Sequence, residues 1–180
     1  MPDNSDYFDF EEDAHDFDED DFEARVWNLL VLINPGDEEL ALQQFNRWRE
    51  HLAEDGQPLE ADSDWVPALF TAIAWQSGFE VERDDLESLQ SAVNELSARF
   101  NLQLDWGGDL DDEDFAADLD GVQLMSTAFD RLREHNYTLW SVDAGSDGFT
   151  GWMVLTRDDD VLLALCSLLN VEVRLGSDPF

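Results

Sequence analysis

Two strand-like segments separated by a turn restrict the folds available to this chain. Residues 137–142 and 149–155 are rich in apolar, aromatic and β-branched side chains, and residues 143–148 between them supply the Gly, Asp and Ser that turns favour. The pattern predicts an antiparallel hairpin. Because a lone hairpin cannot bury its faces, we expect further strands and covering helices.

Helical periodicity accounts for most of the remaining chain. The clearest helix spans residues 84–100, where apolar residues recur at intervals of three and four and Asp84 stands at the start. Together the patterns predict an α+β fold, with a mixed sheet of about four to five strands packed by about five to seven helices. Further helices are predicted at residues 37–54, 64–77, 122–135 and 158–169, with one more from Asp20 or Asp21 to residue 33 and a short one around Phe115. Further strands are predicted at residues 79–82, 102–106 and 171–175.

Length and composition indicate one globular domain, residues 21–180, preceded by an acidic arm, residues 1–20. The arm interleaves Tyr7, Phe8, Phe10 and Phe17 with acidic residues. A purely solvating tail has no need of aromatic side chains. The pattern is therefore typical of a segment that docks onto its own domain or onto a basic, partly apolar partner, with disorder as the third alternative.

Acidic residues greatly outnumber basic ones along the whole chain. There are 44 Asp and Glu against 9 basic residues, all Arg, which gives a net charge of −35. A body this negative repels phosphate, so we expect no direct binding to nucleic acid or to an anionic membrane, and we expect attraction to basic proteins. Two other interpretations stay open: that the charge serves solubility, and that it reflects an acidic host proteome.

A second acidic stretch occupies residues 109–120. If the acidity serves a partner, its acids join the arm aromatics as candidate contact residues, because opposite charge raises the association rate while buried aromatic side chains supply anchor energy. The candidates in this stretch are Asp109, Asp111, Asp112, Glu113 and Asp114.

The sequence contains no recognisable catalytic, metal or cofactor motif. A phosphate-binding loop requires the lysine that this chain lacks, and the single cysteine, Cys166, can form neither an internal disulfide nor a structural zinc site. Cys166 lies in an apolar run and is expected to be a small buried side chain. The calcium-loop spacing at residues 16–27 lacks the required Gly and the final Glu. We predict no catalytic residue, no metal ligand and no cofactor.

An enzyme with carboxylate or metal-assisted chemistry is the alternative in a different class. Its best candidates are Asp143 and Asp147 with Trp140 and Trp152, all in or beside the predicted hairpin. Ligand pockets combine aromatic walls with a few polar groups, and this region has both.

The N-terminus carries no basic region followed by an apolar one, and the longest apolar run, residues 29–33, is far too short to span a membrane. We therefore expect no signal peptide, no membrane association and a cytoplasmic location. The sequence makes no prediction about oligomeric state.

Three blocks of the sequence resemble a family of bacterial proteins with no established activity, one of the domain-of-unknown-function families. The blocks are residues 27–37 (WNLLVLINPGD), residues 75–79 (WQSGF), and residues 137–140 (YTLW) together with Gly151 and Trp152. The resemblance covers about residues 24–175 and leaves the acidic arm outside. Its motifs are tryptophans, glycines and turn residues, so it implies a bacterial, cytoplasmic setting and transfers no functional residue.

The sequence favours a non-enzymatic, acidic interaction protein that occupies the basic surface of a partner, as an inhibitor, an immunity protein or a mimic of nucleic acid does. The alternatives are the carboxylate- or metal-dependent enzyme and an acidic housekeeping domain without a charge-selected partner.

Overall fold

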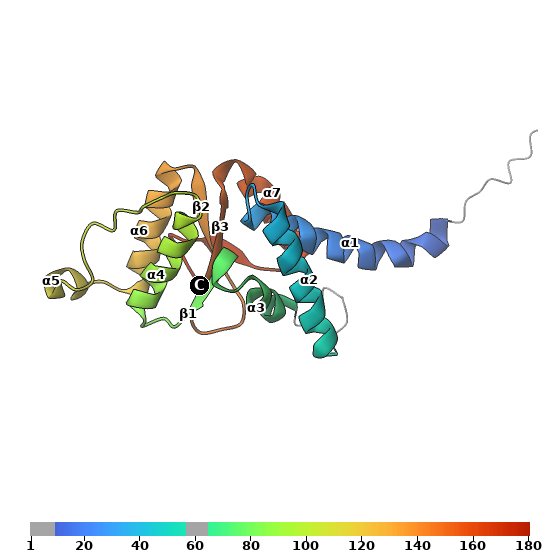
Figure 1. Cartoon of the computed structure of the whole chain (residues 1–180), viewed down its shortest axis with the longest axis horizontal. Coiled ribbons are helices and arrows are strands. Elements are labelled where there is room, and N and C mark those ends of the chain that lie inside the picture. Colours follow the sequence, from blue (N-terminus) through green and yellow to red (C-terminus); the bar gives the residue numbers. More distant parts are fainter. Residues whose placement is uncertain (1–9, 57–64) are drawn as a thin grey trace, which may run out of the picture.

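The computed structural model describes the backbone of residues 10–56 and 65–180, and within that part the side chains from Phe22 onward except 74 and 75 (Figure 1). This part of the chain contains seven α-helices, one 3-10 turn and four strands. They are α1 Phe10–Ile33, α2 Glu38–Glu54, α3 Trp65–Ser77, β1 Phe79–Val81, α4 Leu86–Ala98, α5 Glu113–Ala116, α6 Gly121–Glu134, β2 Tyr137–Val142, β3 Phe149–Leu155, η1 Thr156–Asp158, α7 Asp159–Leu168 and β4 Val173–Leu175.

The strands form one sheet in the order β1-β3-β2-β4. The predicted hairpin is β2 and β3, with Trp140 opposite Trp152. The α+β class is confirmed, but every strand pairing in the described residues is antiparallel, where a mixed sheet was predicted. The segment that contains α7 connects β3 to β4 and carries the chain past β2. β3 and β4 run in the same direction, but β2 lies between them, so they never pair.

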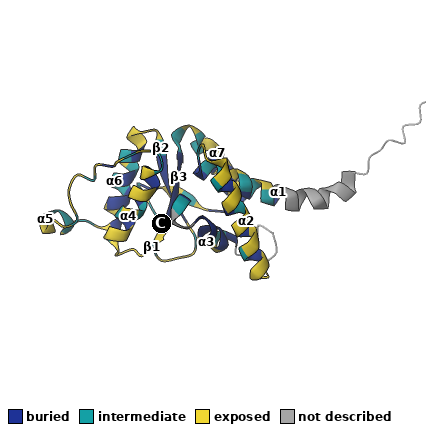
Figure 2. Cartoon of the chain, in the orientation of Figure 1, coloured by how far each residue is buried: buried dark blue, intermediate teal, exposed yellow. Residues whose placement is uncertain are grey.

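Helices cover both faces of the sheet, and one hydrophobic cluster fills each side. Alternate strand residues such as Trp140 and Trp152 face a cluster built with α1, α2, α3 and α7. Leu139 and Met153, on the other face, join a cluster built with α4 and α6. β2 and β3 are therefore buried almost throughout, as Figure 2 shows, which explains why their sequences are nearly continuous apolar runs. The shared sheet joins both clusters into one domain.

Acidic side chains fix the starts of several helices. Asp85 accepts a hydrogen bond from the Ser88 main-chain N–H at 3.0 Å and so caps α4. Asp120 caps α6 in a reciprocal box with Gln123. After the end of α4 at Ala98, Asn101 adopts φ 57° and the Leu102 N–H returns to the Ser97 carbonyl at 3.0 Å. These local signals explain why the predicted helix at 84–100 is confirmed as a slightly shorter one.

Two secondary-structure predictions were wrong. Residues 102–106 form no strand, although Leu104 is buried and Leu102 and Trp106 pack on the α4–α6 cluster. The alternating pattern there reflects burial against this cluster without pairing to a strand. α1 begins at Phe10 rather than near Asp20, since no Gly or Pro interrupts residues 10–33.

Candidate functional site

The aromatic residues predicted as partner contacts in the arm cannot be placed. Tyr7 and Phe8 lie outside the described residues. Phe10 and Phe17 belong to the first part of α1, whose side chains are not described. The structure therefore leaves this part of the predicted site untested.

The predicted acids of the second stretch all lie at the surface, in the loop before α5 and in its first turn. Asp109 accepts the Asp111 N–H at 3.0 Å, and Asp112 accepts the Asp114 N–H at 3.0 Å. These short loops hold their own backbone through carboxylate side chains. The acids therefore have a structural role in addition to any contact with a partner.

The fold brings a second group of acids next to this stretch. α5 projects from the end of the molecule where α4 and α6 begin (Figure 1). A groove of about 320 Å³ lies there, with Asp84, Asp85 and Glu87 of the α4 start along it. Its apolar part comes from Leu86, Leu110 and Ala116. We call the three acids that line this groove, together with the acids next to Leu110 in the sequence, the acidic rim: Asp84, Asp85, Glu87, Asp109, Asp111, Asp112, Glu113 and Asp114.

Sequence reasoning missed Asp84, Asp85 and Glu87 as members of this surface. Their position before a helix is fully explained by capping, so the sequence alone gave no reason to place them beside residues 109–114. Hydrogen bonds from Ser88 hold the pKa of Asp85 below its usual range, which keeps this member of the rim charged.

No acid of the rim forms an ion pair with a described basic residue. The ion pairs of the described part lie elsewhere. Arg83, which is adjacent in sequence, turns away: Nε donates to the Asp147 carbonyl at 3.1 Å and Nη2 to the Phe180 main-chain oxygen at 2.6 Å. Its guanidinium lies 4.6 Å from the Phe149 ring centroid. The positive ends of α4 and α6 offset part of the rim charge, but no side chain that the structure describes neutralises it.

The residues proposed for an enzyme do not come together in one pocket. Trp140 and Trp152 are buried in the cluster below α3 and α7, where Trp152 stacks on Phe70 with ring centroids 5.5 Å apart. Asp143 and Asp147 are exposed in the hairpin loop, and Asp143 accepts the Gly145 N–H. Within the described residues, no three His, Cys, Asp or Glu side chains converge in a way that could hold a metal ion.

Asp159, at the start of α7, is a half-buried carboxylate that sequence reasoning also missed. It accepts hydrogen bonds from Thr138 Oγ1 at 2.9 Å and from Trp140 Nε1 at 3.3 Å, and Arg133 Nη1 lies 3.9 Å away. Burial raises the pKa of Asp159 above its usual range. These contacts attach α7 to β2, and Asp159 lines neither the rim groove nor the groove beside β4 described below.

A buried polar network connects α1, α2, α3 and the end of α4. The Asn34 side-chain amide donates to Gln44 Oε1 at 2.7 Å, and Gln44 Nε2 donates to Ser77 Oγ at 2.7 Å. Arg99 approaches from α4 and donates to the Gln76 carbonyl. Asn34, Gln76 and Ser77 belong to the blocks that carry the family resemblance, so these motif residues meet in a structural junction.

Among the residues that the structure describes, no helix is both long and apolar enough to cross a membrane. Neither a curated protein nor a solved structure matches the chain significantly.

A family model described as a domain of unknown function (DUF6630) does match it, over residues 25–176. The match covers most of the chain and nearly the same residues as the resemblance identified from the motif blocks. The chain therefore belongs to the DUF6630 family of domains of unknown function.

Proposed function

We propose that this protein is a non-enzymatic interaction protein of the cytoplasm that binds a basic partner through the acidic rim. The observation that carries the proposal is one groove with apolar walls that Asp84, Asp85 and Glu87 line, opposite Leu110 and Ala116 of the segment that bears the acids at 109–114. No described basic side chain pairs with them. The acids of the rim therefore lack a cationic group to pair with, and a basic partner would supply one.

The shape of the groove suits a lysine or arginine side chain. Such a side chain places its methylene stem on apolar surface and its charged end near carboxylates. Leu86 and Leu110 supply the apolar surface, and Asp84 and Glu87 supply the carboxylates. The net charge of −35 adds long-range attraction, which raises the association rate and rejects acidic partners.

The partners that fit are proteins with a surface patch of Lys and Arg, including proteins that bind nucleic acid. Toward these the chain would act as an inhibitor, an immunity protein or a mimic of nucleic acid. Direct binding to nucleic acid is disfavoured because phosphate meets the same negative surface.

A matched pair of charge variants tests the rim. The rim variant carries Asp84→Asn, Glu87→Gln, Asp111→Asn, Glu113→Gln and Asp114→Asn, which spares the α4 cap. The control variant loses the same charge at exposed acids elsewhere: Glu38→Gln, Glu39→Gln, Glu50→Gln, Asp55→Asn and Glu95→Gln. The probe is a blocked helical peptide of lysine, leucine and alanine, and its affinity is measured by calorimetry over a series of salt concentrations.

We expect the rim variant to bind the peptide about tenfold more weakly and with less salt dependence, and the control variant to bind within about twofold of the parent chain. Equal weakening in both variants would show that the attraction comes from diffuse charge. That result would favour the interpretation that the acidity reflects solubility or the host proteome.

A further inference from the structure

β4 leaves one edge of the sheet open. On its inner side, the Glu172 carbonyl accepts the Asp143 N–H at 3.0 Å, and the Gly176 N–H donates to the Leu139 carbonyl at 2.8 Å. Because strand backbones alternate, the N–H and C=O groups of Val173 between them point away from β2. The described residues provide no partner for these groups of Val173. An unpaired strand edge is a template for another strand.

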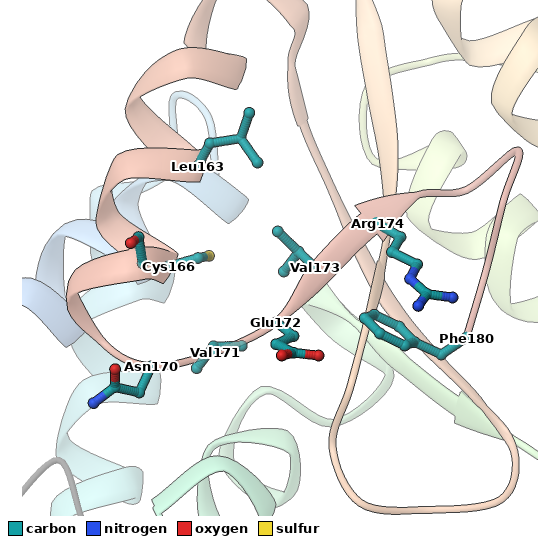
Figure 3. A pocket seen from close by; sticks show the side chains of 9 residues that line it. Leu163, Cys166, Asn170, Val171, Glu172, Val173, Arg174 and Phe180 are labelled. Carbon is teal, nitrogen blue, oxygen red and sulfur yellow. The ribbon is translucent and has the colours of Figure 1, made fainter.

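A groove of about 520 Å³ runs along this open edge, between α7 and the end of the chain (Figure 3). Figure 3 shows Leu163 and Val173 pointing into the space between α7 and β4, with the Cys166 sulfur beside them. Leu163 is 43% exposed although it is apolar. The open edge therefore has an apolar wall next to it.

The two faces of β4 differ in chemistry. Val173 lies opposite Val142 and packs toward the cluster under α7. Glu172 and Arg174 belong to the opposite face, where the Arg174 guanidinium lies 4.3 Å from the Phe180 ring centroid. Glu172 is exposed and forms no ion pair within the described part of the chain. A strand added here would meet apolar groups on one face, and on the other the Glu172 carboxylate next to an Arg174 guanidinium that is engaged with Phe180.

We propose that the groove beside β4 binds an extended segment of a partner protein as an additional strand of the sheet. The segment alternates apolar side chains, which contact Leu163 and Val173, with Lys or Arg side chains, one of which pairs with Glu172. Its main chain bonds to the free N–H and C=O of Val173. This site shares no residue with the acidic rim and goes beyond the function proposed for the rim.

Charge selects a basic segment of another protein over a second copy of this chain. Two copies would each bring a net charge of −35 to the contact, whereas a segment bearing Lys or Arg is attracted to it. The same charge also attracts any cationic peptide to any face, so the test must separate strand pairing from unspecific attraction.

Backbone methylation provides this separation, since it leaves the peptide charge unchanged. The probe is a blocked peptide of alternating valine and arginine, used in three forms: unmethylated, N-methylated at the valine amides, and N-methylated at the arginine amides. Only one set of amides can face β4 in a given pairing. We expect one methylated form to bind the full chain at least about tenfold more weakly and the other within about threefold of the unmethylated peptide. Equal affinities for the two methylated forms overturn the proposal, as does failure of the unmethylated peptide to bind.

Two variants of α7 locate the binding. Leu163→Gln changes the groove, and Val161→Gln changes a 55% exposed apolar residue on the same helix that does not line it. We expect about tenfold weaker binding in the first and no change in the second. Equal loss of peptide affinity in the two variants overturns the proposal. A dimer in sedimentation experiments that Leu163→Gln dissociates also overturns it, because a second copy of the chain would then occupy the edge. The neutralised rim variant should affect all peptide forms equally, so failure at one site is distinguishable from failure at the other.

Discussion

Arg99 Nη2 donates to the side-chain oxygen of Asn34 at 3.0 Å, a contact between residues 65 positions apart. Asn34 follows the last turn of α1, and Arg99 follows α4. The bond therefore connects helices that cover opposite faces of the sheet. Arg99 also donates to the Gln76 carbonyl and to Ser77 Oγ, so all its described hydrogen-bond acceptors are neutral groups.

Replacing Arg99 by Met should lower the free energy of unfolding by about 1–3 kcal/mol, because it removes several partly buried hydrogen bonds and leaves the Gln76 carbonyl with one partner fewer. Arg47 is the matched control. It is exposed and reaches only Gln76 Oε1 at 3.5 Å, so Arg47→Met should change stability by about 0.5 kcal/mol or less. Urea titrations of both variants test this. Equal losses would show that Arg99 is not a junction residue.

The two tryptophans of the hairpin should differ in their response to phenylalanine. Trp140 Nε1 donates to Asp159 Oδ1, whereas the buried Trp152 Nε1 has no hydrogen-bond partner in the described structure. Both substitutions remove ring volume, but only Trp140→Phe removes a hydrogen bond. We expect Trp140→Phe to be more destabilising than Trp152→Phe by about 1 kcal/mol in urea unfolding. The opposite order would contradict the assigned partners.

Asp159 should make the stability of the chain depend on pH in an unusual direction. Burial raises its folded-state pKa above 3.8, so as pH falls from neutral the folded state takes up this proton before the unfolded state does. The stability of the parent chain relative to Asp159→Asn should therefore rise as pH falls through the folded-state pKa, and level off below 3.8. Urea unfolding of both proteins across this range measures the difference. A flat difference would show that the carboxylate is solvated.

Asp85 should show the opposite sign. Hydrogen bonds from Ser88 lower its folded-state pKa below 3.8, so its charged form stabilises α4 at all higher pH values. The stability of the parent chain relative to Asp85→Asn should fall only once the pH drops below 3.8 and through the folded-state pKa. The same unfolding series records this loss, and its appearance at a pH above that range would contradict the assignment.

Cys166 should be chemically protected in the native protein. Burial raises the pKa of its thiol to about 12, and only the thiolate reacts readily. Alkylation by iodoacetamide at neutral pH should be slower than in the urea-unfolded chain by about three orders of magnitude, as expected for a thiolate fraction reduced to this extent. Mass spectrometry over time measures both rates. Similar rates in the two states would mean that the groove beside β4 exposes the sulfur.

The sequence was most informative where apolar residues run almost without a break, as in the hairpin, or repeat with the helical period, as in residues 84–100. β2 and β3 coincide with the predicted segments 137–142 and 149–155, and α4 lies within the predicted helix at 84–100. Period reports which side of a segment is buried, but not what covers it. Residues 102–106 were therefore assigned to a strand although they pack on helices, and the predicted sheet was mixed because strand order cannot be read from local patterns.

The candidate site could be predicted only in part for the same reason. The acids at 109–114 form a visible cluster in the sequence, whereas Asp84 and Glu87 join them only through the placement of α4 beside α5. Trp140 and Asp143 are close in sequence, yet one points into the core and the other into solvent. Only the three-dimensional fold shows that these two neighbouring residues lie in different environments.

The position of β2 between β3 and β4 also determines an order of assembly. β4 has only β2 to pair with, and residues that pair across α7 are far apart in the chain compared with the hairpin residues. The hairpin closes a short loop and can form early, whereas β4 finds no template until β2 is in place. β4 thus joins the sheet only after the hairpin, and the edge it presents does not exist before β2 is in place.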